Sequence, residues 1–75
     1  MTIQNKSLRI VKALTPNSSR SIESLAMELG IATTKIEESK IAYTLKYNGL
    51  VTVNYYDDGT MISLTDEGEQ VIPFI

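Results

Sequence analysis

The chain has 75 residues, a formal net charge of -2 and 43% hydrophobic residues, and it contains neither cysteine nor histidine. Disulfides, thiolate metal sites and imidazole chemistry are therefore excluded, and no other catalytic arrangement stands out. A chain this short hides only about 60% of the surface that its unfolded form exposes, so its core is thin. We expect one domain over residues 1–75 that is not an enzyme and needs no cofactor or metal.

The charges are unevenly distributed along the chain. Residues 1–30 have a balance of +2 and residues 31–50 of +1, whereas residues 51–75 have a balance of -5. The weakly basic first part is compatible with a nucleic-acid partner. No apolar run approaches the roughly 20 residues that span a bilayer, and no basic-then-apolar leader is present. We therefore expect a cytoplasmic protein without membrane contact.

Two amphipathic helices are predicted in the first part of the chain. Apolar residues at intervals of three predict a helix over about residues 5–14, which Pro16 closes, with three basic side chains in water: Lys6, Arg9 and Lys12. A second helix begins after Ser21, a plausible N-cap, and ends at Gly30, and Arg20 lies before it in a very short extended piece. Its apolar face is expected to consist of Ile22, Leu25, Ala26 and Leu29.

A third helix is predicted from Thr33 to Asn48. Thr33 and Thr34 can accept from free amides at its start, and Asn48-Gly49 favours its end. At about 100° per residue the helix has two apolar-containing stripes on nearly opposite sides. The stripe expected to pack inward contains Ile41, Ala42 and Leu45. The stripe expected to face outward contains Ile36, Lys40, Tyr43 and Tyr47.

After Val51 the apolar period changes from 3.6 to 2, which predicts a β-hairpin. A two-residue type I' turn at Asp58-Gly59 would place Tyr55 opposite Ile62, Val53 opposite Leu64 and Tyr56 opposite Met61. Thr65 then caps a short helix over about residues 66–72, which has acidic residues in its first turn. The apolar residues that follow are expected to fold back on the first helix or to meet another subunit.

Three groups of residues, in this order of elements, carry a resemblance to a known family. They are Leu25-Ala26 with Leu29-Gly30-Ile31, Leu45 with Asn48-Gly49-Leu50-Val51, and Leu64-Thr65 with Gly68. Over nearly its whole length the chain resembles winged helix-turn-helix proteins, particularly small regulators of the MarR and PadR sort. The resemblance implies an α+β fold of three helices, a two-stranded β-hairpin wing and a short C-terminal helix.

The resemblance further implies a recognition helix over residues 33–48 in the DNA major groove, with the hairpin as a wing. Carried over by position, the residues facing DNA would be Arg20, Thr33, Thr34, Lys35, Ile36, Ser39, Lys40 and Tyr43. The chain departs from the family pattern at Glu38, where relatives have an apolar residue, and at the wing tip, which lacks a basic residue. The pair Glu37-Glu38 is expected to be a solvated start of the helix, where the helix dipole favours negative charge. Its outward stripe is also free of arginine.

The leading hypothesis is therefore a small transcriptional regulator that binds double-stranded DNA, acting as a homodimer. The alternative is a winged-helix module that binds another protein through Ile36, Tyr43 and Tyr47, which the acidic wing favours. A third possibility is a piece of a subunit of a larger complex. The helix lysines can be phosphate contacts or an ordinary solvated face. For Tyr43 and Tyr47 we favour a place in the core or in a subunit interface.

Overall fold

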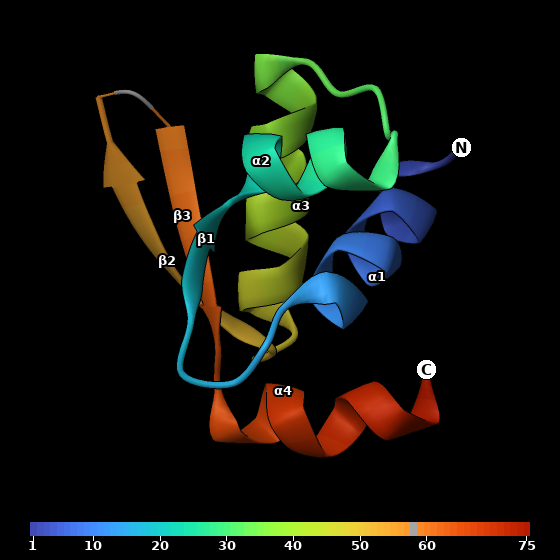
Figure 1. Ribbon diagram of the computed structural model, residues 1–75, viewed down its shortest axis with the longest axis vertical. Coiled ribbons are helices and arrows are strands. Elements are labelled where there is room, and N and C mark those ends of the chain that lie inside the picture. Colours follow the sequence, from blue (N-terminus) through green and yellow to red (C-terminus); the bar gives the residue numbers. More distant parts are fainter. Residues whose placement is uncertain (58) are drawn as a thin grey trace.

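The computed structural model describes residues 1–57 and 59–75. Helix, strand and turn elements follow one another in the predicted order (Figure 1). They are α1 (Ile3–Ala13), β1 (Ser19–Ser21), α2 (Ile22–Leu29), α3 (Lys35–Tyr47), β2 (Val51–Tyr56), β3 (Gly59–Leu64), α4 (Asp66–Val71) and the 3-10 helix η1 (Ile72–Phe74).

The ends of α2 and α3 are fixed by the residues predicted to cap them. The Ser21 side chain accepts from the backbone N–H of Ser24, and Gly30 ends α2 in the left-handed conformation with φ of 70°. Thr34, one residue after the predicted start, caps α3 by accepting from the N–H of Glu37, while the Glu37 side chain accepts from the N–H of Thr34. This reciprocal pair is a capping box, which satisfies two amides at the helix start.

The sheet has three antiparallel strands in the order β1-β3-β2, so the extended piece around Arg20 is a true edge strand. The predicted hairpin register is wrong by two residues: Val53 lies opposite Ile62, and Tyr55 lies opposite Thr60. A slip of two keeps every side chain on its face, so alternation alone cannot distinguish the registers. The predicted Asp58-Gly59 turn falls partly on Asp58, outside the described residues, whereas Gly59 itself pairs with Tyr56 in the ladder.

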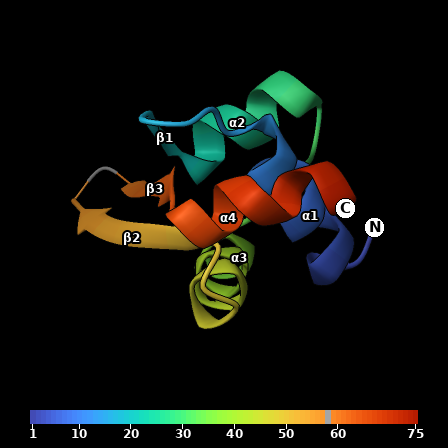
Figure 2. The same cartoon turned by 90° about the horizontal axis from the view of Figure 1, so that it is seen from below.

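The core lies between α1, α2, α3 and the inner face of the sheet. Its members are Ile10, Val11, Leu14, Ile22, Leu25, Ala26, Ile31, Ile41, Ala42, Leu45, Val51 and Ile62. In Figure 1 the hairpin stands beside α3, and α1 lies on the other side of that helix. Figure 2, seen from below, shows α4 crossing the lower end of the molecule next to α1 and α3.

Four side chains differ from the sequence expectation. Leu29 is 39% exposed because α2 ends there and its last turn leaves the core. Leu8 is only half-buried, since α1 turns Ser7 and Ile10 fully inward. Lys6, expected in water, has a side chain only 12% exposed, and Glu38, expected in solvent, is 5% exposed. The Lys6 side chain is largely buried because its ammonium group donates to the Glu37 carboxylate and to the Ala32 carbonyl, as described below.

The start of α4 is joined closely to the segment that follows α3. The Thr65 N–H donates to the Leu50 carbonyl at 3.0 Å, and the Thr65 hydroxyl donates to the Gly49 carbonyl at 2.6 Å. The same hydroxyl accepts from the Gly68 N–H at 2.9 Å. Gly68 is buried against Leu50, and a Cβ there would lie 2.2 Å from the Leu50 carbonyl oxygen. In the part of the chain that the structure describes, no helix is long and apolar enough to cross a membrane.

Candidate nucleic-acid interface

The α3 helix separates a buried side from a solvent-facing side, as the two stripes predicted. Ile41 and Ala42 are fully buried and Leu45 is 2% exposed, so this side anchors the helix in the core. On the opposite side, Ile36 is 71% and Tyr43 66% exposed, and the neighbouring Ser39 and Lys40 are exposed as well. We call the side formed by Ile36, Ser39, Lys40 and Tyr43 the outer face of α3. All four residues are exposed to solvent.

The beginning of α3 is held by a polar network rather than left open. Besides its capping role, Glu37 accepts a hydrogen bond from the Lys6 ammonium at 3.0 Å, and the same ammonium donates to the Ala32 carbonyl at 2.7 Å. The hydrogen bond from Lys6, followed by that from the Thr34 amide, lowers the pKa of Glu37 below its usual value. The helix start therefore presents an ionised carboxylate, so it is not a ready anion site.

Two of the predicted DNA-facing bases are paired with carboxylates on α2. Arg20 on β1 forms an ion pair with Glu28 and also donates to the Ser24 hydroxyl at 3.1 Å. Lys35 in the first turn of α3 lies 3.4 Å from a carboxylate oxygen of Glu23. Both pairs are solvent-accessible, so each holds its base only weakly. Lys40 forms no ion pair with any residue that the structure describes.

Seven of the eight predicted site residues lie together along one helix. Thr34 is its N-cap and Thr33 lies half-buried in the turn before it, while five follow on the exposed side: Lys35, Ile36, Ser39, Lys40 and Tyr43. Arg20 comes from β1, and through Glu28 it adjoins α2 rather than α3. Whether these residues contact DNA remains a prediction. The five exposed residues on α3 form one surface along its solvent-facing side.

A cluster of tyrosines extends this surface toward the hairpin. The rings of Tyr43 and Tyr47 stack with centroids 6.0 Å apart and planes inclined by 23°. Together with Lys46 and Tyr55 they line a shallow hollow of about 260 Å³. Tyr43 is 66%, Tyr47 78% and Tyr55 66% exposed. Of the two places expected for Tyr43 and Tyr47, the core of this chain is therefore excluded, and a subunit interface stays a prediction. Helices leave a face outward when their opposite face alone fills the core.

Lys46 and Tyr55 are members of this cluster that sequence reasoning did not single out. Lys46 lies three residues after Tyr43, a spacing that brings helical side chains together. The place of Tyr55 could be predicted only from the hairpin register, because the pairing of the strands decides which residues of β2 lie beside the second half of α3. Because the predicted register was wrong by two residues, the sequence did not place Tyr55 in this cluster.

Comparison with known proteins supports the fold. No protein-family model matches the sequence, and no curated protein does either. The crystal structure of the YusO protein from Bacillus subtilis is similar, with a TM-score of 0.70 at 18% sequence identity over 91% of this chain. The chain spans about half of YusO, since the match covers 49% of that protein. At this identity the likeness concerns the fold alone, and it confirms the winged helix-turn-helix architecture.

Proposed function

We propose that this protein binds double-stranded DNA through the outer face of α3 and regulates transcription by occupying its site as a homodimer. The observation that carries this proposal is the exposure of that face, with Ile36 at 71% and Tyr43 at 66%, on a helix whose other side is anchored in the core. A helix held in this way by a preceding helix and turn fits the major groove of DNA. The cytoplasm, where chromosomal DNA is accessible, would be its location.

The side chains of the outer face suggest a division of roles. Lys40, which has no carboxylate partner in the described part of the chain, would bind a phosphate. Ser39 and the two threonines before the helix, Thr33 and Thr34, offer hydroxyl groups to phosphates or base edges. Ile36 would contact a thymine methyl group, and Tyr43 would donate from its phenol.

Arg20 and Lys35 would flank this contact after exchanging partners. Each now binds a carboxylate of α2, Glu28 or Glu23, and a phosphate would have to displace that carboxylate. Exposed pairs of this kind are worth no more than about 1 kcal/mol, so the exchange is inexpensive. The free energy of breaking both ion pairs nonetheless lowers the DNA affinity of a single copy, and binding of two copies to two half-sites compensates for this loss.

The proposal is tested by selecting bound duplexes from a random pool and measuring affinity for the best one by fluorescence anisotropy. Lys40→Ala should weaken binding about tenfold and reduce the slope of log affinity against log salt by about 1. Lys12→Ala, an exposed base on α1, serves as the matched control and should change neither quantity at protein concentrations at which both variants are dimers. Absence of duplex binding by the unaltered protein at tens of micromolar and low salt would refute the proposal.

A second experiment uses the ion pairs themselves. Glu23→Gln releases Lys35 and Glu28→Gln releases Arg20, and each removes one negative charge beside the surface. Both variants should bind the selected duplex more tightly than the unaltered protein does, by several-fold at low salt. Glu69→Gln, an exposed carboxylate on α4, is the control for the change in net charge alone, at concentrations at which every variant is a dimer. Equal gains in all three variants would argue that Lys35 and Arg20 lie away from the DNA.

The second candidate function is binding of another protein, and the tyrosine cluster favours it. All four tyrosines of the chain are at least 60% exposed, and Ile36 is exposed on the same helix as Tyr43 and Tyr47. The sequence pI is about 4.9. Tyrosine-rich exposed surfaces are common in protein interfaces. If this function holds, peptides selected from a displayed library should lose binding to Tyr47→Ser and Tyr55→Ser, and no duplex should bind.

A further inference from the structure

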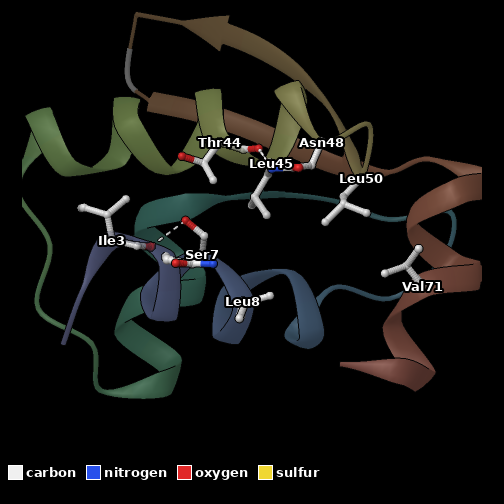
Figure 3. A pocket seen from close by; sticks show the side chains of 9 residues that line it. Ile3, Ser7, Leu8, Thr44, Leu45, Asn48, Leu50 and Val71 are labelled. Atoms are coloured by element: carbon white, nitrogen blue, oxygen red, sulfur yellow. Dashed lines mark hydrogen bonds between the residues drawn. The ribbon is translucent and has the colours of Figure 1, made fainter.

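A groove opens at the opposite end of the molecule from the start of α3. It has a volume of about 640 Å³ and lies between α1, the second half of α3 and α4. Figure 3 shows Ile3, Leu8, Leu45, Leu50 and Val71 around this space, with Val71 on the α4 side facing the side chains of the other two helices. The lining is mainly aliphatic, so the groove suits an apolar side chain.

The same chain exposes such a side chain beside the groove. Phe74 in η1 is 88% exposed, the largest exposure among the bulky hydrophobic residues of the described chain. Residues three apart lie on one side of a 3-10 turn, so Phe74 continues the side on which Val71 forms the groove wall. The bonds of Thr65 to Gly49 and Leu50 fix the start of α4. Phe74 does not line the groove of its own copy and keeps 88% of its surface exposed.

The two helices that border the groove have opposite charge. α1 contains Lys6, Arg9 and Lys12 and no acidic residue, and of these Arg9 and Lys12 are exposed. α4 contains Asp66, Glu67 and Glu69, all exposed, and no basic residue. A surface with both signs on adjacent helices is complementary to a second copy of itself when a two-fold axis places α4 of one copy over α1 of the other.

We propose that two copies of this chain pair about a two-fold axis, each inserting Phe74 into the groove between α1, α3 and α4 of the other. A single sequence supplies both the groove and the ring that fills it, which is the condition for an isologous contact. This inference rests on the proposed function, which calls for two copies, and it names the surface that joins them. The surface leaves the outer face of both α3 helices uncovered, because the groove residues of α3 are Thr44, Leu45 and Asn48.

Sedimentation velocity over a range of concentrations tests the pairing on the full chain. The unaltered protein should sediment as a dimer, and Phe74→Ser should raise the dimer dissociation constant at least tenfold, whereas Phe74→Leu should raise it less. Phe74 is 88% exposed, so its replacement should leave the fold intact, and circular dichroism of the variant checks this. Tyr47→Ser, which removes another exposed ring away from the groove, is the matched control and should not alter the dimer.

Charge reversal tests the complementarity separately. Arg9→Glu with Lys12→Glu should weaken self-association, and Asp66→Lys with Glu69→Lys should weaken it equally. An equimolar mixture of the two doubly altered proteins should form a heterodimer more readily than either forms a homodimer. Raising the salt concentration should weaken the unaltered dimer and the heterodimer alike.

Isotope-filtered nuclear Overhauser spectra of a mixed-label sample identify the occupant of the groove directly. Contacts between the Phe74 ring and the methyl groups of Leu8 or Leu50 in differently labelled copies would support the inference. The same contacts within one copy of a monomeric protein would overturn it, as would a dimer that Phe74→Ser leaves unchanged. None of these measurements involves DNA, so a dimer without duplex binding would refute only the proposed function. A monomer that binds duplex would refute this pairing and the homodimer of the proposed function, and it would leave the DNA contact of α3 standing.

Discussion

The two ends of α3 are stabilised in different ways. At its start, Thr34, Glu37 and Lys6 exchange side-chain hydrogen bonds near the surface. After its end, Thr65 and Gly68 bring α4 into direct contact with the backbone of Leu50. Polar side-chain networks tolerate rearrangement and respond to pH and salt, whereas close backbone contacts permit little change. The comparison indicates that α3 has an adjustable start, beside the proposed DNA surface, and a rigid end.

Gly68→Ala is expected to have the largest effect, because it attacks the rigid end. The new Cβ would lie 2.2 Å from the Leu50 carbonyl oxygen and 3.1 Å from Leu64 Cδ2, so the backbone must move. We expect a loss of about 3 kcal/mol in the free energy of unfolding, measured by urea denaturation. Gly30→Ala is the control: its Cβ meets no atom within 4 Å, and the left-handed backbone alone should cost about 1–2 kcal/mol. Equal losses would show that the contact with Leu50 is not tight.

Thr65→Val tests the same end through its hydrogen bonds. The substitution keeps the shape of the side chain but removes the hydroxyl that bonds the Gly49 carbonyl and the Gly68 amide. Two part-buried groups lose a partner, so unfolding should become easier by about 2 kcal/mol. Thr65→Ser, which retains the hydroxyl, should recover most of this loss in the same denaturation experiment. If Thr65→Ser did not recover the stability, the loss would come from side-chain packing and not from the hydrogen bonds of the hydroxyl.

Thr34→Ala tests the adjustable end. The variant loses the side-chain acceptor for the Glu37 amide, and a lost N-cap typically costs about 1 kcal/mol. The loss should be smaller than that of Thr65→Val, because solvent can replace the missing acceptor at this exposed site. Thr34→Ser should restore the stability. A larger loss for Thr34→Ala than for Thr65→Val would reverse the comparison of the two ends.

Glu37→Gln should have the smallest effect at neutral pH, because Lys6 keeps the Ala32 carbonyl as a partner, and a clear effect on acid sensitivity. Glutamine can still accept from the Thr34 amide, so the capping box survives. In the unaltered protein the Lys6 ammonium lowers the pKa of Glu37 below 4.5 in the folded state. The stabilisation is then complete above about pH 4.5 and is lost as the pH falls through the lowered folded pKa. Urea midpoints measured from pH 7 to pH 3 should fall less for Glu37→Gln than for the unaltered chain.

Much of the fold was predictable from sequence because its local rules agree. Ser21, Gly30 and Thr65 each occupy the cap position that their chemistry favours, and the two stripes of α3 follow from spacing alone. The hairpin register was not predictable, since two registers that differ by two residues place the same apolar side chains inward. The short extended piece at Arg20 was predicted, but its pairing with β3 was beyond sequence, because the three residues Ser19–Ser21 have no alternation to detect.

The candidate site was predictable in outline and not in its charges. Periodicity placed Lys40 and Tyr43 outward, as observed. Pairing of Lys6 with Glu37 and of Arg20 with Glu28 joins residues 31 and 8 positions apart, and tertiary packing decides such contacts. Glu38 is buried although it was expected in solvent, which the spacing of polar residues could not indicate.

Ser21 belongs at once to the last position of β1 and to the N-cap of α2. Opening of β1 would therefore remove the Ser21 side chain as the acceptor at the start of α2. Separation of β1 from β3 and fraying of α2 at Ile22 should then occur in one step. Backbone amides of both elements should then exchange with deuterium at matching rates. A molecule that pulled on the hairpin would in this way loosen α2, which packs against α3, without touching α3 itself.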